Sequence, residues 1–177
     1  MNAKLLLSEK ELDIILNRLA CQLIEKHTDF KSTKLIGLQP RGVFFANRIA
    51  KILKENYQIK HLDLGCLDIT FFRDDFRRGN KTLQANQTQI DFLVEDQKVV
   101  FIDDVLYTGR SINAALTALQ SYGRPSEVEL MVLIDRRFSR HLPIQPDYRG
   151  RQVDAINNEK VVVKWLENEG EDAVYIV

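Results

Sequence analysis

The stretch Lys98-Val99-Val100-Phe101-Ile102-Asp103-Asp104-Val105-Leu106-Tyr107-Thr108-Gly109-Arg110-Ser111 carries an apolar run into a short polar loop. The run at 99–102 predicts a buried strand, and two adjacent carboxylates follow it directly. Beyond the loop, apolar residues recur at helical spacing and predict a helix that packs back on the sheet. These residues are Ile112, Ala115, Leu116 and Leu119. Strand, loop and helix in this order are typical of an α/β fold.

The same alternation extends in both directions along the chain. Ser8 and Glu11 have the spacing of a capping box, which predicts a helix with an apolar stripe from Leu12 to Leu23. Short apolar runs predict further strands at 34–38, 62–72 and 128–134. We therefore expect a mostly parallel central sheet flanked by helices on both faces, built by residues 1–177 as a single domain.

Composition narrows the class of protein. The 177 residues carry 25 Lys+Arg and 25 Asp+Glu, so the formal net charge is +0 and no global field favours nucleic acid or membrane. Cys21 and Cys66 lack metal-ligand spacing and are interpreted as free thiols in a reducing compartment. The apolar run at the N-terminus is too short for a signal peptide, and no stretch is long enough to span a bilayer. A cytoplasmic protein with no membrane partner is expected.

The adjacent acids Asp103 and Asp104 end the predicted central strand. In open α/β sheets the ligand crevice lies beyond the carboxyl ends of the strands. Two carboxylates there suit sugar hydroxyls or the hydration shell of a magnesium ion. The alternative is a single acid that caps the next helix, but two acids followed by Thr108-Gly109-Arg110-Ser111 favour a binding site.

The loop Thr108-Gly109-Arg110-Ser111 is the candidate phosphate site. Gly109 lets the backbone approach an anion closely, and the N-terminus of the following helix favours negative charge. The alternative is an ordinary Thr or Ser N-cap, which needs one hydroxyl rather than two. The segment matches neither the Gly-Lys-Ser/Thr phosphate loop nor a Gly-x-Gly-x-x-Gly turn. A ribose 5-phosphate needs acids and a phosphate loop at this spacing.

Two further loops carry candidate residues. Gln39-Pro40-Arg41-Gly42 separates a predicted strand from a predicted helix, which places Arg41 in a loop at the expected crevice. Residues 74–89 are polar, follow Arg73 and lack a clear period, so we interpret them as a functional or mobile hood. For both arginines, the alternative is an ordinary surface side chain.

The stretch 99–111 resembles the phosphoribosyl pyrophosphate (PRPP) signature of the type I phosphoribosyltransferases. Gly37-Leu38-Gln39-Pro40-Arg41-Gly42 is similar to the pyrophosphate loop of that family, and residues 68–75 resemble the segment that leads into its hood. The resemblance implies that Asp103 and Asp104 hold the ribose hydroxyls and contact Mg²⁺, directly or through water. It implies that Val105, Leu106, Tyr107, Thr108, Gly109, Arg110 and Ser111 bind the 5-phosphate end of PRPP or UMP. Pro40, Arg41 and Arg73 take pyrophosphate, and Arg136 lies near the base.

One subgroup fits best, the bifunctional pyrimidine-operon attenuator/uracil phosphoribosyltransferases. Gly123-Arg124-Pro125, residues 132–136 and residues 142–148 carry that similarity. It implies transfer of ribose 5-phosphate from PRPP to uracil, giving UMP and pyrophosphate, by a homo-oligomer. Asp103, Asp104, Arg41 and Arg73 are then the candidate catalytic residues. The segment 135–143 departs from the subgroup, because it is one residue longer and lacks a glycine.

Two alternatives stay open at this point. The region 136–151 is basic, and Arg140 and Arg151 are its candidate contacts to an mRNA leader. The chain is then an RNA-binding attenuator that senses UMP and PRPP with little catalysis. The altered segment after Asp135 leaves a purine-base phosphoribosyltransferase as the other alternative.

Overall fold

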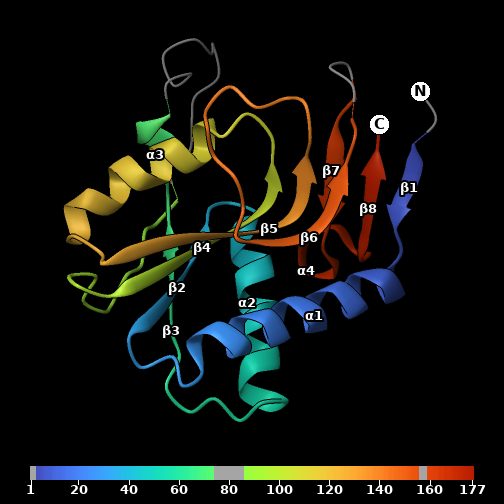
Figure 1. Ribbon diagram of the computed structural model, residues 1–177. Helices are drawn as coiled ribbons and strands as arrows, with labels where there is room; N and C mark the ends of the chain where they lie inside the picture. Colours follow the sequence, from blue (N-terminus) through green and yellow to red (C-terminus); the bar gives the residue numbers. More distant parts are fainter. Residues whose placement is uncertain (1–2, 74–85, 156–158) are drawn as a thin grey trace.

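Figure 1 shows the computed structural model, which describes residues 3–73, 86–155 and 159–177. Its main sheet has the strand order β3-β2-β4-β5-β6, and every pairing in it is parallel. These strands are β3 (Asp63–Leu67), β2 (Thr33–Leu38), β4 (Lys98–Leu106), β5 (Glu127–Arg136) and β6 (Tyr148–Val153). The central parallel sheet predicted from the sequence is therefore confirmed.

Helices cover both faces of this sheet (Figure 1). The helices α1 (Glu9–His27) and α2 (Gly42–Glu55) lie on one face, and α3 (Arg110–Leu119) lies on the other. The apolar side chains form two clusters, one on each side of the sheet. Val100 and Ile102 of β4 pack toward α1 and α2, whereas Val99 and Phe101 pack toward α3. This alternation along one strand is the reason that β4 reads as a continuous apolar run.

A smaller antiparallel sheet joins the two ends of the chain. Its order is β1-β8-β7, made by β1 (Lys4–Leu7), β8 (Ala173–Ile176) and β7 (Val161–Lys164). Trp165 follows β7, is fully buried and stacks on Phe45 of α2, with 6.1 Å between ring centroids. This contact fixes β7 and the short helix α4 (Leu166–Glu169) beside the N-terminal half of α2.

Local signals in the sequence place some boundaries correctly and miss others. The capping box forms, since the Ser8 backbone N–H donates to the Glu11 carboxylate at 2.9 Å and the Glu11 N–H points back to the Ser8 hydroxyl. The strand predicted over 62–72 is shorter, because β3 ends at Leu67 and a 3₁₀ turn, η1, covers Thr70–Phe72. β4 is longer than its apolar run, so Asp103 and Asp104 lie inside the strand. The predicted hood falls mostly outside the described residues, and only 86–89 of it are described.

No helix in the described parts of the chain is both long and apolar enough to cross a membrane.

Candidate active site

Because Gly42 has no side chain, the loop before α2 lies directly against the acidic end of β4. A Cβ atom on Gly42 would lie 2.4 Å from the carbonyl oxygen of Ile102 and 3.0 Å from the Cα of Asp103. Those distances leave no room for a side chain, so only glycine lets α2 begin this close to β4. The contact brings the loop 39–41 next to the two acids, and the Gln39–Pro40 peptide bond within it is cis.

Asp103 and Asp104 occupy different surroundings. Asp103 lines a cavity at the carboxyl end of the sheet, and its Oδ1 accepts the backbone N–H of Asp104 at 2.9 Å. Asp104 is 8% exposed and is not among the residues that line the cavity. The division agrees with the expectation that neighbouring side chains of a strand point to different sides.

Both carboxyls are held at raised pKa values. Burial and the charge of Asp104 raise the pKa of Asp103 well above its usual range. Burial raises the pKa of Asp104 to about 6, while the Arg41 guanidinium and backbone N–H groups act in the opposite direction. Acids that resist ionisation in the free protein gain from a ligand that donates hydrogen bonds or brings positive charge.

The predicted phosphate loop encloses that cavity, which has a volume of about 370 Å³. Its walls are Arg73, Asp103 and the whole of residues 105–112, which include Val105, Leu106, Tyr107, Thr108, Gly109, Arg110 and Ser111. Their binding of a phosphate stays a prediction. The N-terminus of α3 lies in this wall, where helix N–H groups lack partners within the helix and favour an anion. Arg73 also lowers the pKa of Asp103 by its charge, which places it on the same side.

Gly109 sets the shape of the loop. It precedes α3 with a φ of +88°, a left-handed conformation that favours glycine. A Cβ atom there would lie 3.2 Å from Ile144 and 3.4 Å from Leu142. The carbonyl oxygen of Thr108 accepts the N–H groups of His141 and Leu142, so the segment after β5 forms the outer wall of the loop.

Replacing Gly109 by valine is expected to weaken PRPP binding by about tenfold or more. A β-branched residue with positive φ costs on the order of 1–3 kcal/mol, and its side chain would also press on Ile144. The dissociation constant of PRPP, measured by calorimetry, checks this. Thr117→Val on the exposed side of α3 is the control, and equal affinity in both variants would contradict the assignment of the loop.

Arg41 lies beside the acids but is held by the C-terminal part of the chain. Its Nη1 donates to the carbonyl oxygen of Val163 in β7, and its Nη2 donates to Glu169 of α4 at 2.8 Å. Neither contact was predicted, since the partners lie more than 120 residues away along the chain. The pyrophosphate role of Arg41 stays a prediction.

The loop that follows β3 is fixed by a buried acid. The Asp68 carboxylate accepts the N–H and hydroxyl of Thr70 and the N–H of Asn86. Gln89 exchanges two backbone hydrogen bonds with Cys66 of β3, each 2.9 Å long. Asp68 therefore joins Thr70 and Asn86 just beyond the end of β3.

Arg136 and Arg140 close the site on its β5 side. The Arg136 guanidinium lies 4.0 Å from the centre of the Tyr107 ring, so the arginine predicted near the base is stacked on the phosphate loop. Arg140 donates to the carbonyl oxygen of Tyr107 and to the buried carboxylate of Asp135. Arg149 donates to the same carboxylate at 3.1 Å.

Arg151 lies apart from the other predicted residues. It donates to the carbonyl oxygen of Leu6 at 2.8 Å and lies 3.9 Å from Glu11, at the outer edge of the sheet. Arg18 of α1 donates to the carbonyl oxygens of Arg149 and Gly150 on the same strand, β6. The basic residues predicted to meet RNA thus divide between this edge and the loop after β5.

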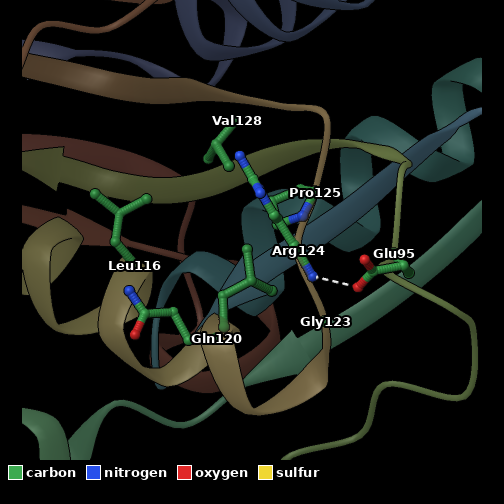
Figure 2. A pocket seen from close by; sticks show the side chains of 8 residues that line it. Glu95, Leu116, Gln120, Gly123, Arg124, Pro125 and Val128 are labelled. Atoms are coloured by element: carbon green, nitrogen blue, oxygen red, sulfur yellow. Dashed lines mark hydrogen bonds between the residues drawn. The ribbon is translucent and has the colours of Figure 1, made fainter.

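A larger groove lies at the amino ends of β4 and β5, beside the C-terminal end of α3. It has a volume of about 730 Å³ and is drawn in Figure 2, where the backbone N–H of Arg124 donates to Glu95 at 2.7 Å. Its other lining residues include Leu116, Gly123, Pro125 and Val128. None of the predicted site residues lines it, and ligands of parallel sheets bind at the carboxyl ends of the strands rather than here. The Gly123-Arg124-Pro125 motif therefore serves the turn into β5.

Comparisons with known proteins agree with this geometry. The family model for the phosphoribosyl transferase domain matches residues 3–168. The "Bifunctional protein PyrR" of Desulfosudis oleivorans is 42% identical over 165 residues, covering 93% of this chain and 91% of the relative. The protein of the same name from Acetivibrio thermocellus is 45% identical over 161 residues, covering 91% and 86%.

Solved structures show the same fold at lower identity. A hypoxanthine phosphoribosyltransferase from Staphylococcus aureus superposes with a TM-score of 0.70 at 22% identity, covering 94% of this chain and 86% of that one. The hypoxanthine phosphoribosyltransferase of Trypanosoma cruzi gives 0.72 at 16% identity, covering 98% and 90%. With the phosphate loop, the paired acids and the parallel sheet in place, the chain belongs to the phosphoribosyl transferase domain family.

Proposed function

We propose that the protein transfers ribose 5-phosphate from PRPP to uracil, giving UMP and pyrophosphate, with residues 1–177 acting as one catalytic domain. The observation that carries this proposal is the cavity shared by Asp103, Arg73 and the loop at 105–112. A single ligand with a phosphate at one end, ribose hydroxyls in the middle and a diphosphate beyond them matches the order of these groups. The similarity to the proteins named "Bifunctional protein PyrR", together with the sequence resemblance to the attenuator/uracil phosphoribosyltransferase subgroup, favours uracil as the acceptor.

Each group of residues has one task in this reaction. The α3 N-terminus and the residues 108–111 hold the 5-phosphate, and Asp103 and Asp104 accept hydrogen bonds from the ribose hydroxyls. The bond from the sugar C1 to the pyrophosphate oxygen breaks while a ring nitrogen of the base forms the new bond to C1, and the proton of that nitrogen passes to the departing pyrophosphate. Positive charge builds on the sugar in the transition state, and hydrogen bonds from the ribose hydroxyls offset the burial that raises the pKa values of both acids.

Arginine side chains stabilise the charge that leaves with pyrophosphate. Arg73 lies in the cavity wall, and Arg41 lies beside Asp104 in the loop before α2. Guanidinium groups bind phosphate oxygens through paired, charge-assisted hydrogen bonds, so both suit the diphosphate. Arg136, stacked on Tyr107, is placed to contact the base.

The donor set fits magnesium that is carried in with the substrate. The described residues hold no group of three or more His, Cys, Asp or Glu side chains suited to enclose a metal, whereas the Asp103 carboxylate lines the cavity and Asp104 is its neighbour along β4. Magnesium keeps several waters and is commonly held by one or two carboxylates together with substrate phosphates. When bound, it neutralises charge on the diphosphate; Asp103 and Asp104 are the residues that would hold it.

The test is a PRPP-dependent assay across the free bases, run with and without magnesium. Formation of UMP from uracil, with release of one pyrophosphate for each UMP, is the expected result. Equal rates with uracil and hypoxanthine would leave the acceptor unassigned, and faster transfer to hypoxanthine would establish the purine alternative. No turnover with any base would reject the catalytic proposal.

We propose binding of an mRNA leader as a second function, which the basic edge formed by Arg18, Arg149 and Arg151 favours. Backbone carbonyl groups fix the Arg18 and Arg151 guanidinium groups along β6 and β1, and the Arg149 and Arg151 side chains are 46% and 44% exposed. Fixed, exposed arginines along one strand suit a phosphate backbone. Arg140 serves this function by holding the loop after β5 through Asp135. An attenuator with little catalysis would bind RNA but form no UMP.

Arg151→Ala is expected to weaken binding of the leader RNA several-fold and to reduce the slope of log K against log salt by about one. Arg140→Ala is expected to weaken binding as well, because Asp135 loses one of its two arginine partners. Filter binding at several salt concentrations measures both effects. Arg124→Ala, in the groove at the amino ends of β4 and β5, is the control, and binding that does not depend on salt or on RNA sequence would count against this function.

Two further expectations belong to this proposal. The free cysteines Cys21 and Cys66 and the consumption of nucleotide precursors favour a cytoplasmic location. Similarity to the family favours a homo-oligomer, which sedimentation of the purified protein would test.

A further inference from the structure

Helix α4 carries two glutamates that pair with different arginines of the α2 region. Glu167 pairs with Arg48 at 2.7 Å, and Glu169 pairs with Arg41 at 2.8 Å. Arg48 stacks over Trp165 at 4.8 Å and also pairs with Asp172, so its contacts serve the packing of α4 against α2. Arg41, in contrast, lies in the loop that contributes to the proposed pyrophosphate site. The two ion pairs therefore have similar distances, but only the Arg41–Glu169 pair lies at the proposed pyrophosphate site.

Both terminal nitrogens of the Arg41 guanidinium are engaged. Nη1 donates to the Val163 carbonyl oxygen, and Nη2 donates to the Glu169 carboxylate. The Arg41 and Glu169 side chains are 39% and 25% exposed, so solvent and ligands reach the pair. The charge of Arg41 also acts on Asp104, which places the guanidinium between the acids of β4 and the acid of α4.

This arrangement opposes the binding of a diphosphate at Arg41. An arriving diphosphate meets a guanidinium of which each terminal nitrogen already donates one hydrogen bond, and it meets the negative charge of Glu169 next to them. It gains the full charge-assisted interaction with Arg41 only by competing with the Glu169 carboxylate for the same guanidinium. The net gain is the difference between two interactions of the same kind, so the affinity for diphosphate is lower than a free arginine would give.

We infer that Glu169 is a positioning residue that limits the affinity of the site for diphosphate, because it holds Arg41 against β7 and α4 until a diphosphate displaces it. The inference rests on the proposed function, since it assigns the diphosphate of PRPP and the pyrophosphate product to Arg41. The inference also gives the Arg41–Glu169 ion pair a role in product release. As pyrophosphate leaves, the Glu169 carboxylate takes back the Arg41 guanidinium, which favours product release.

The experiment compares Glu169→Gln with Glu167→Gln. Both variants replace a carboxylate of α4 by its neutral amide, and only one of them faces Arg41. We expect Glu169→Gln to bind magnesium pyrophosphate about five- to tenfold more tightly in calorimetry, because a neutral acceptor competes less well for a guanidinium. The KM for PRPP falls in parallel while kcat does not rise, since product leaves more slowly. Glu167→Gln stays within twofold of the parent protein.

A double variant shows whether Glu169 acts through Arg41. In an Arg41→Gln background, Glu169→Gln is expected to leave pyrophosphate binding unchanged, since the group it releases is gone. If Glu169→Gln does not fold, as judged by its thermal transition, Glu169→Asp takes its place. The shorter acid reaches Arg41 less well, and a smaller change of the same sign is expected.

The outcomes separate the two proposals. Normal UMP formation with unchanged or weaker pyrophosphate binding in Glu169→Gln overturns the inference alone. Tighter pyrophosphate binding in Glu169→Gln, with no UMP formed by the parent protein, overturns the proposed reaction and supports the inference. A parent protein that binds neither PRPP nor pyrophosphate overturns both.

Discussion

Asp104→Asn is expected to reduce kcat/KM for UMP formation by about 100-fold or more. The amide keeps the size of the side chain but loses the charge that acts on Arg41 and that we propose to meet the ribose hydroxyls. Groups that stabilise developing charge in an enclosed site are typically worth about 10²–10³ in rate, which is about 3–4 kcal/mol. Steady-state kinetics with PRPP and uracil measure the loss, and unchanged turnover would remove Asp104 from the mechanism.

The same substitution is expected to stabilise the protein at neutral pH. The pKa of Asp104 is raised to about 6 by burial, whereas an unfolded aspartate titrates near 3.9. The folded state therefore binds the proton more tightly, and the stability that this contributes at low pH is lost as the pH rises from about 4 through 6. Above pH 7 the loss amounts to about 3 kcal/mol, and the neutral amide does not incur it.

Denaturant unfolding at pH 4.5 and pH 8 checks this effect. The variant is expected to gain stability over the parent protein mainly at pH 8. Asp63→Asn, an exposed carboxylate at the start of β3 that pairs with Lys34, is the matched control. If the unfolding free energies of the parent protein and of Asp104→Asn change in parallel with pH, then ionisation of Asp104 does not lower the stability of the free protein.

Gly42→Ala is expected to impair both folding and catalysis, although it adds only one methyl group. The new Cβ would lie 2.4 Å from a backbone oxygen of β4, so helix and strand must move apart. Overpacking of this kind costs about 1–3 kcal/mol, and backbone atoms cannot yield as a flexible side chain does. Because the loop 39–41 moves with the helix, we also expect a loss of about 100-fold in kcat/KM.

Thermal denaturation and steady-state kinetics together test the Gly42 prediction. Lys51→Ala, on the exposed side of the same helix, is the control for a change in helix composition. A Gly42→Ala variant that keeps full activity would mean that the spacing between α2 and β4 does not set the position of the pyrophosphate loop.

Short-range patterns in the sequence predict the parts of the fold that depend on neighbours along the chain. The capping box of α1, the strand at β2 and the helix after the phosphate loop all have such patterns. The strands β1, β6 and β8 do not, because they are short; β1 and β8 also gain hydrogen bonds from each other across nearly the whole chain. β4 extends beyond its apolar run because β5 continues to pair with it as far as Leu106 and Asp135.

The residues of the candidate site also fall into two groups, those that the local sequence predicts and those that only the tertiary fold brings together. The loop at 105–111 and the acids could be predicted, since one continuous stretch places them together. The contacts of Arg41 with Val163 and Glu169, and of Arg140 with Asp135, depend on how β7, α4 and the loop after β5 fold back. An acidic C-terminal stretch is visible in the sequence, but nothing local distinguishes Glu169 from Glu167. The packing of Trp165 against α2 places α4 so that Glu169, and not Glu167, meets Arg41.

Because β1 pairs with β8, the N-terminal and C-terminal strands of the fold are neighbours in one sheet. Lys4 is the Cα partner of Ile176, so the first and last strands of the fold lie side by side. A short peptide that joined these ends would disturb neither sheet, and new ends opened in an exposed turn would leave every pairing intact. Circular permutation therefore offers a way to move the chain ends, and a reporter domain fused to them, to a chosen exposed turn of this fold.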